Sequence, residues 1–236
     1  MFDVFSDAAK VAQQLEIIAS EFPFAIWETM YSLVLEVVFA YLVGLPLGVL
    51  LVTGEKDGVK PLPKPFMAVL NVVINLLRSV PFLILMIIAL PLSKLIVGTK
   101  VGTMATVPPM VIAAFPLVAR MVESSLREVD QGVIEAAQSM GASAWQIVTK
   151  VMLPEALPSL ISGCTISVGT ILGYGAMAGI IGGGGLGKIA INYGYYNFKY
   201  LVMWAAVIGL ILLVQIFQSG GTWLGNKCDK RLKNRG

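Results

Sequence analysis

The sequence predicts an all-α fold, a polytopic bundle of membrane-spanning helices. Hydrophobic residues make up 57% of the 236 residues and charged residues only 13%, and the mean hydropathy is +0.82. A soluble domain averages about 25% charged residues, so most of this chain must face lipid or protein. Five segments are long and apolar enough to span a bilayer, and the alternating ten-residue strands typical of a barrel are absent from the sequence.

The first 22 residues predict an amphipathic helix rather than a signal peptide. Apolar residues recur at steps of three and four from Val4 to Phe22, and polar residues fill most of the other face. The start has no basic region and carries Asp3 and Asp7 instead. We expect this helix to lie in the membrane interface or to pack across the rim of the bundle.

The five predicted spans cover approximately residues 24–52, 66–92, 101–122, 157–181 and 201–224. Pro46 breaks the first span gently, Pro81 falls inside the second, and Pro108, Pro109 and Pro116 weaken the third. No internal repeat and no Pro-rich or Ser-rich linker divides the chain, so we expect one domain.

The distribution of Lys and Arg predicts the orientation, because cytoplasmic flanks are enriched in these residues. With five spans, alternate flanks share a side. The flanks after the first, third and fifth spans hold most of the 17 basic residues, namely Lys56, Lys60, Lys64, Arg120, Arg127, Lys150, Lys227, Lys230, Arg231, Lys233 and Arg235. The C-terminus and the segment around Glu135 are therefore predicted to be cytoplasmic, and the N-terminus to lie outside.

The composition excludes several classes of function. There is no histidine, which removes a Ser-His-Asp triad and the commonest metal ligand. Cys164 falls in an apolar segment and Cys228 in a polar tail, so we expect no disulfide. The net charge is +3, and the basic residues are not clustered with aromatic residues, so nucleic acid is not an expected partner.

Residues 128–156, between the third and fourth spans, predict a water-exposed helical elbow. Asp130 can cap a first helix, and Gly141 suits the left-handed position just past its end. Ser143 to Gln146 has the form of a capping box that would start a second helix. The apolar residues of the first helix fall on one face: Val133, Ile134, Ala137, Met140 and Gly141. Further on, Pro154 and Pro158 interrupt or redirect the chain.

This stretch resembles the EAA loop of ABC-importer permeases, which reads Glu-Ala-Ala, three residues, Gly, nine residues, Ile, any residue, Leu-Pro. The chain matches every fixed position except one, where Val151 stands for Ile. The resemblance implies a cytoplasmic coupling helix that docks on an ATPase subunit; the alternative is an ordinary amphipathic surface elbow. The residues that it assigns to coupling are Glu135, Ala136, Ala137, Gly141, Ala142, Trp145, Leu153 and Pro154.

Further stretches are similar to the methionine branch of this family, and the resemblance extends from about Trp27 to the C-terminus. They are Trp27 to Thr29, Gly44 to Leu50, Arg78 to Phe82, Arg120 to Glu123, Gly182 to Gly187 and Tyr193 to Tyr195. The resemblance implies a type I ABC-importer permease fold, with a permease domain over residues 23–225 and a basic cytoplasmic tail over residues 226–236.

The same resemblance implies the partners and the compartment. Two copies of the chain would form the pathway in a bacterial inner membrane, two ABC ATPase subunits would dock at the elbow, and an extracytoplasmic binding protein, often a lipoprotein, would deliver methionine. No cofactor is expected on this chain, since ATP and magnesium would bind to the ATPase. The rivals are a permease for another amino acid or small solute, a membrane-embedded enzyme, and a scaffold.

The fourth span suggests where a pathway would run. Its glycines, at spacings of four residues, allow close approach of helix backbones. Tyr174 and Met177 share a face next to them, so they are candidates for a gate, although plain packing explains them equally simply. Arg78 and Glu36 are intramembrane charges at similar predicted depth, so they would pair, or Arg78 would face the pathway and hold a substrate carboxylate.

Two other motifs have plainer interpretations. The run from Gly182 to Lys188 fits phosphate-loop patterns, but Ile189 stands where a Ser or Thr would hold magnesium and no buried strand precedes it. A flexible turn is the preferred interpretation. Arg120, Glu123 and Arg127 stand at helical spacing and predict ion pairs along a solvated helix end.

Overall fold

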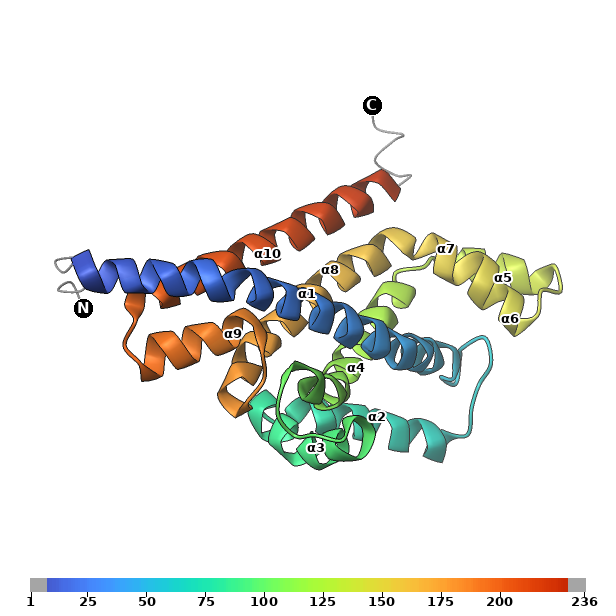
Figure 1. Cartoon of the computed structure of the whole chain (residues 1–236). Helices are drawn as coiled ribbons and strands as arrows, with labels where there is room; N and C mark the ends of the chain where they lie inside the picture. Colours follow the sequence, from blue (N-terminus) through green and yellow to red (C-terminus); the bar gives the residue numbers. More distant parts are fainter. Residues whose placement is uncertain (1–7, 229–236) are drawn as a thin grey trace. The chain divides into compact units, whose positions relative to one another are not determined.

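The structure is a computed structural model that describes residues 8–228, and within that range all the regular elements are helical (Figure 1). The all-α prediction is therefore confirmed. The α-helices are α1 (Ala8–Thr53), α2 (Lys64–Ser79), α3 (Phe82–Val97), α4 (Thr103–Arg127), α5 (Gln131–Ser139), α6 (Ala144–Ile147), α7 (Leu153–Glu155), α8 (Leu157–Ala178), α9 (Gly185–Ile189) and α10 (Tyr200–Cys228). The 3-10 and π-helical segments are η2 (Val148–Met152), η3 (Gly179–Ile181) and η4 (Ala190–Tyr196).

Four helical segments are long and apolar enough to cross a membrane by length and composition: α1, α4, α8 with η3, and α10. The pair of α2 and α3 adds a fifth if it is counted as one broken span. These segments coincide with the five predicted spans. The basic tail of the prediction falls largely on residues 229–236, outside the described residues.

Helix α1 joins two elements that the sequence treats separately. Its 46 residues include both the described part of the amphipathic start and the first span, and they run through Pro46 without a break. At about 1.5 Å per residue, the helix is about 69 Å long. Because the hydrocarbon core of a bilayer is only about 30 Å thick, part of α1 must lie beyond that core or the helix must be tilted.

The second span is not the single helix that the sequence predicts. Helix α2 ends at Ser79 and α3 begins at Phe82, so the chain is interrupted at Val80 and Pro81. Val80 is extended, with φ −74° and ψ 130°. A residue before proline is pushed away from the helical region by the proline ring, which is the physical reason for the break.

The described chain divides into two compact units, and the division passes through α1, α4, α8 and α10. The first unit consists of residues up to Val37, Pro81–Ile112 and Gly169–Ile216. The second consists of Val38–Val80, Ala113–Val168 and the residues from Phe217. The gate candidates Tyr174 and Met177 belong to the first unit, whereas the elbow belongs to the second.

Each unit has its own apolar core. In the first, α1, α9 and α10 contribute a cluster that consists of Ala25, Leu186, Ile189, Val202 and Ala206. In the second, α1, α2 and α4 contribute Leu51, Ile74 and Ala119. These small and branched side chains hold the elements that carry the polar groups described below.

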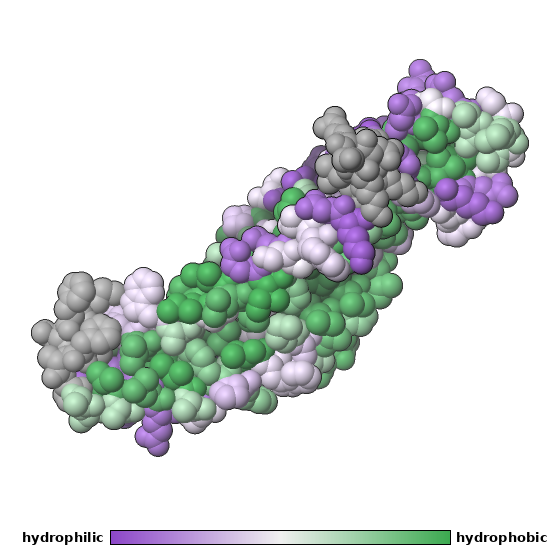
Figure 2. Space-filling view, turned by 90° about the horizontal axis from the view of Figure 1, so that it is seen from above, coloured by the Kyte–Doolittle hydropathy of each residue, from purple (hydrophilic) through white to green (hydrophobic). Residues whose placement is uncertain are grey.

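Large apolar side chains also cover much of the molecular surface, as the green areas of Figure 2 show. Exposed examples on the candidate spans are Leu42, Val69, Leu76, Ile88, Leu95, Ile211 and Ile216. Soluble monomers rarely expose apolar patches of large extent, so such a surface is typical of a protein that is covered by lipid or by other subunits.

Candidate functional site

The first helix of the predicted elbow is α5, which begins directly after Asp130. The Asp130 carboxylate accepts a hydrogen bond from the Gly132 amide at 2.7 Å, so the predicted N-cap is confirmed. Ile134 and Ala137 are buried, as an inward-facing apolar stripe requires. The helix is therefore fixed at its start by a side-chain cap and along its length by two apolar contacts.

Gly141 reverses the chain between the two helices of the elbow. Its φ is +78°, the left-handed conformation predicted for the residue past the helix end. The turn satisfies carbonyl groups at the end of α5, because the Ala142 amide donates to Ala137 at 3.1 Å and the Gly141 amide donates to Gln138 at 2.9 Å. A Cβ atom at Gly141 would have no neighbour within 4 Å, so the outer side of the turn is open.

The second helix begins with the predicted capping box. The Ser143 amide donates to Gln146 Oε1 at 2.8 Å, and the Gln146 amide donates to Ser143 Oγ at 3.4 Å. Helix α6 passes into the wider π-helical η2 just before Leu153 and Pro154, and proline has no amide hydrogen for a helical bond. Helix α7 is three residues long and includes Pro154, and its C-cap is Ala156, one residue before α8 begins.

Most residues that the resemblance assigns to coupling are accessible. Ala142 and Leu153 are half-buried, whereas the exposed members of the set are Glu135, Ala136, Gly141, Trp145 and Pro154. Ala137 is buried and holds α5 in place, so it is not part of the accessible surface. Trp145 is 75% exposed, so its ring is accessible to a partner.

The apolar residues predicted to share one face of the elbow's first helix differ in their exposure. Met140 is 81% exposed and Val133 is exposed as well. They stand seven residues apart, two helical turns, and so form a stripe next to the buried one rather than part of it. Met140 therefore joins Trp145 as an exposed apolar side chain of the elbow.

A cavity of about 300 Å³ lies between α5 and the segment that follows α1. The elbow lines it with Gln131, Ile134, Glu135, Gln138 and, from η2, Met152. The other lining residues are Val52, Glu55, Asp57, Gly58, Val59 and Arg127. Because residues 52–59 are far from the elbow in the chain, the local signals of the elbow could not predict this cavity.

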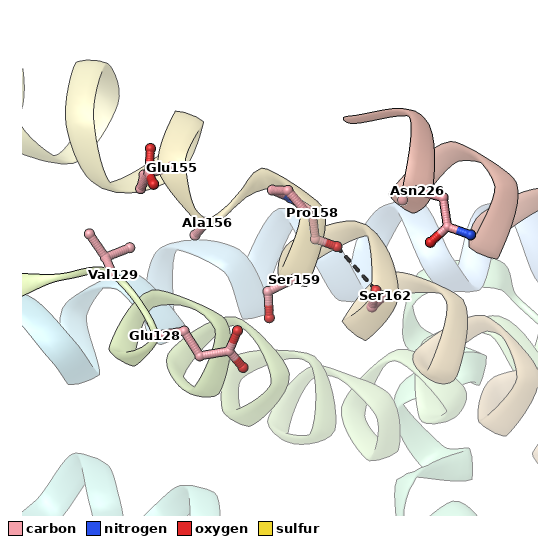
Figure 3. A pocket seen from close by; sticks show the side chains of 9 residues that line it. Glu128, Val129, Glu155, Ala156, Pro158, Ser159, Ser162 and Asn226 are labelled. Atoms are coloured by element: carbon pink, nitrogen blue, oxygen red, sulfur yellow. Dashed lines mark hydrogen bonds between the residues drawn. The ribbon is translucent and has the colours of Figure 1, made fainter. Parts of the chain in front are cut away.

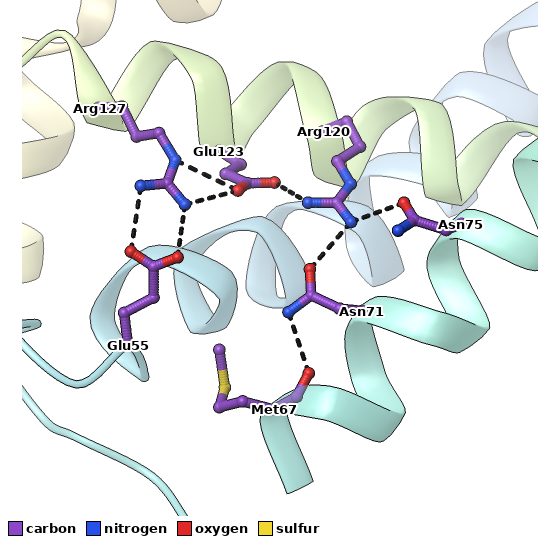
Figure 4. Close-up of polar contacts among 7 residues, drawn as sticks. All are labelled: Glu55, Met67, Asn71, Asn75, Arg120, Glu123 and Arg127. Atoms are coloured by element: carbon purple, nitrogen blue, oxygen red, sulfur yellow. Dashed lines mark hydrogen bonds and ion pairs between the residues drawn. The ribbon is translucent and has the colours of Figure 1, made fainter. Parts of the chain in front are cut away.

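Arg120, Glu123 and Arg127 form the ion pairs that their spacing predicts, and the network extends further (Figure 4). Arg120 pairs with Glu123 at 2.6 Å, and Arg127 pairs with the same carboxylate at 2.8 Å. Arg127 also binds Glu55, after α1, at 2.7 Å. Arg120 donates to the side-chain oxygens of Asn71 and Asn75 on α2, at 2.9 and 2.8 Å.

A second cavity of about 300 Å³ lies where the end of α4, the start of α8 and the end of α10 meet (Figure 3). Its lining is rich in oxygen atoms from Glu128, Glu155, Ser159 and Ser162. Ser159 Oγ donates to Ser125 Oγ at 3.2 Å, which ties α8 to α4. No group of three metal-ligating residues occurs anywhere in residues 8–228, so this lining has no metal centre of that kind.

The gate candidates differ in their contacts. The Tyr174 ring stacks on Phe82, with ring centroids 4.0 Å apart and an angle of 10° between the planes. Met177 is 47% exposed. Phe82 is the first residue of α3, so the stack joins α8 to the helix that begins just after the Pro81 break. The role of Tyr174 and Met177 in a pathway stays a prediction.

Glu36 and Arg78 lie in different environments. Glu36 is 2% exposed, in the first unit, where it lines a cavity of about 20 Å³ with Thr29 and Ser32. Arg78 lies in the second unit and is exposed in the last turn of α2. The predicted depth of Arg78 counts residues along α2, before the break at Pro81, so the similar depth of the two residues stays a prediction. The pairing of the two residues stays a hypothesis.

The glycine-rich run is held by side chains rather than free as a flexible turn. Glu28 Oε2 accepts a hydrogen bond from the Gly185 amide at 2.9 Å, and Thr103 Oγ1 donates to Glu28 Oε1 at 2.6 Å. Thr29 Oγ1 accepts from the Leu186 amide, also at 2.9 Å. Sequence reasoning missed this cluster, although Glu28 and Thr29 stand next to each other in one of the stretches that carry the resemblance.

Apolar candidate spans and an exposed helical elbow define this chain as a polytopic helical membrane protein. It belongs to the family described as binding-protein-dependent transport system inner membrane components, which matches residues 44–230. The chain is 47% identical over 207 residues to a protein of Vibrio cholerae named "Probable D-methionine transport system permease protein MetI", covering 88% of this chain and 92% of the relative. It is 46% identical over 164 residues to the "Methionine import system permease protein MetP" of Bacillus subtilis, covering 70% and 74%.

Solved structures agree with the family assignment. A chain from inward-facing conformations of the MetNI methionine ABC transporter aligns with a TM-score of 0.88 and 37% identity, covering 91% of this chain and 99% of that one. A second crystal form of the same transporter gives a TM-score of 0.85 and 38% identity, with coverage of 87% and 95%. The predicted ABC-importer permease fold is thereby confirmed.

Proposed function

We propose that this chain is the membrane-spanning permease subunit of an ATP-driven methionine importer. The observation that carries the proposal is the 47% identity, over 88% of the chain, to a relative named as a D-methionine transport permease. Similarity to a methionine ABC transporter over 91% of the chain supports it further. The chain would form the pathway and would itself hydrolyse no ATP.

The energy source would be a separate ABC ATPase that docks on the elbow. The elbow suits this role because Met140 and Trp145 offer apolar contacts on a surface that is fixed by caps at Asp130 and Ser143. Glu135 lies exposed on the same helix as a charged contact. A capped, compact elbow moves with its partner as one piece, which is the property that coupling requires.

Two copies of the chain would assemble around one pathway, with two ATPases on the cytoplasmic side and a binding protein that delivers methionine on the other. The distribution of Lys and Arg supports the placement of the elbow and the C-terminus in the cytoplasm. ATP binding would draw the ATPases together and open the bundle outward, and hydrolysis would reset it. The importer would thus switch between two conformational states, and nucleotide and the loaded binding protein would shift the equilibrium between them.

The test is uptake of radiolabelled methionine into proteoliposomes that hold this chain with its own ATPase, supplied with its binding protein and with ATP inside. We expect uptake that requires ATP and that unlabelled methionine abolishes. ATP-driven uptake of another amino acid instead would contradict the substrate and keep the mechanism. A complex that assembles but transports nothing would favour the scaffold or enzyme alternatives.

The stacked rings of Tyr174 and Phe82 are proposed to keep the pathway closed. An aromatic pair contributes about 1 kcal/mol beyond burial, so Tyr174→Ala should shift a gate toward its open state by about fivefold. The measurement is efflux of preloaded methionine from the same proteoliposomes without ATP. Tyr31→Ala, which removes a ring that faces Trp27 at 6.1 Å, is the matched control. Equal efflux from both variants would contradict the gate.

A further inference from the structure

The Arg127 guanidinium joins two segments that are far apart in the chain. Its Nη1 and Nη2 atoms donate to the two Glu55 oxygens at 3.0 and 2.7 Å, across a sequence separation of 72 residues. Its Nε and Nη2 atoms donate to Glu123 Oε1 at 3.2 and 2.8 Å. A guanidinium that binds a carboxylate through two parallel bonds fixes both the distance and the orientation of its partner.

The segment that Arg127 holds is itself firmly attached to α1. After α1 ends at Thr53, the Lys60 amide donates to the Thr53 carbonyl at 2.9 Å, and the Leu62 amide donates to Gly54 at 3.0 Å. The loop is therefore folded back on the end of α1 before α2 begins. A displacement of Glu55 would therefore move α1 and α2, because these hydrogen bonds keep the loop from absorbing the movement.

Arg127 and the elbow also line one cavity. Only three residues separate Arg127 from the start of α5, and the cavity is lined by Arg127 and Glu55 together with Gln131 and Glu135 of α5. The pair thus lies at the point where the elbow meets the rest of its unit.

A second guanidinium continues the chain of contacts. Glu123, whose side chain is 11% exposed, binds both Arg127 and Arg120. Arg120 then reaches Asn71 and Asn75 on α2 (Figure 4). One carboxylate is shared between two guanidinium groups, so a shift of Arg127 changes the electrostatic environment of Arg120 and its contacts on α2.

The exposure of the outer pair argues against a purely structural role. The side chains of Arg127 and Glu55 are both 46% exposed. Ion pairs so open to water contribute little to the stability of a fold, because solvent screens them and ordering the side chains has an entropic cost. The pair therefore matters more for the relative position of the two segments than for the stability of the fold, as is typical of a positioning contact.

We infer that Arg127 is a positioning residue for energy coupling, which binds Glu55 so that movement of the elbow is transmitted to α1 and α2. This inference rests on the proposed function, since it concerns how an ATPase docked at the elbow would drive the permease. Without the contact, the ATPase would still dock and hydrolyse ATP, and less of that hydrolysis would produce transport.

The test compares Glu55→Gln with Asp57→Asn in the complete complex. Each change removes one negative charge from the loop after α1, and both residues line the same cavity. Of these two loop residues, Glu55 makes an ion pair with Arg127, and no such pair joins Asp57 to Arg127 in the described part of the chain. The readout is the amount of radiolabelled methionine taken up per ATP hydrolysed. For Glu55→Gln we expect a fall of about fivefold or more, in the range of coupling effects, and for Asp57→Asn a ratio near that of the wild type.

Arg127→Lys is the second variant, because it keeps the positive charge and loses the two-pronged geometry. A fall in the same ratio is expected, with unchanged amounts of co-purifying ATPase. Loss of the ATPase from the Glu55 or Arg127 variants would assign the pair to assembly and overturn the inference. So would equal ratios for the Glu55 and Asp57 variants in a complex whose wild type transports. A wild type without ATP-driven uptake would instead overturn the proposed function, and the inference with it.

Discussion

Replacing Gly141 by valine is expected to lower methionine uptake by about tenfold or more while the chain still reaches the membrane. Gly141 has a φ of +78°, which a β-branched residue adopts only under strain. Such strain costs of the order of 1–3 kcal/mol, and about 1.4 kcal/mol corresponds to a factor of ten. Because a Cβ atom at this position meets nothing within 4 Å, the strain would act through the backbone and turn the second helix of the elbow away.

The control for this experiment is Gly141→Asn, since asparagine tolerates the left-handed conformation far better than valine. Uptake close to that of the wild type is expected from it, with the amounts of permease and co-purifying ATPase measured in both variants. If asparagine were as damaging as valine, the strain account would be wrong, and a side chain of any kind would block the docking surface. Normal uptake by the valine variant would show that coupling does not depend on the geometry of this turn.

The second large effect is expected for Gly187→Ala, which should destabilise the chain by about 1–3 kcal/mol or more. Gly187 lies in α9, against the backbone of α8. A Cβ atom there would lie 2.6 Å from Ala176 Cα and 2.8 Å from its carbonyl carbon. Backbone atoms cannot rotate out of the way as a side chain can, so α9 would have to move as a whole.

Gly175→Ala provides a matched control for Gly187, because the same methyl group would meet nothing within 4 Å on α8. Alanine there is expected to be neutral or slightly stabilising, since glycine inside a helix costs about 1 kcal/mol relative to alanine. Thermal unfolding of the purified complex, followed by tryptophan fluorescence, measures both variants. A similar midpoint for the two would mean that α9 shifts without cost and that its contact with α8 does not hold the unit together.

The parts of the structure that the sequence predicted are those with local signals. Asp130, Gly141 and the capping box of Ser143 act on backbone groups within a few residues of themselves, so their residue types were sufficient evidence for the elbow. The long helices could also be predicted from local signals, because about 20 consecutive residues are enough to show their apolar composition. Even the interruption at Pro81 had a local cause, although the sequence analysis treated that span as one helix.

The parts that could not be predicted depend on contacts between distant residues. Arg127 meets Glu55 across 72 positions and Gly185 meets Glu28 across 157, and no spacing rule connects such pairs. The sequence identified Arg120, Glu123 and Arg127 as neighbours on one helix but gave no sign of their partners on α2 or after α1. The exposure of Val133 and Met140 could not be predicted for a related reason, since periodicity groups apolar residues without telling which of them are covered by a partner.

The hydrogen bonds of the glycine-rich run show what this part of the chain does in the fold. Loops that bind phosphate present backbone N–H groups to an anion supplied from outside. Here the anion is the carboxylate of Glu28 on α1, which accepts hydrogen bonds from both the Gly185 amide and the Thr103 hydroxyl. The chain thus carries its own substitute for a phosphate. The run whose sequence resembles a nucleotide-binding motif joins α1, α4 and α9 through hydrogen bonds within the chain.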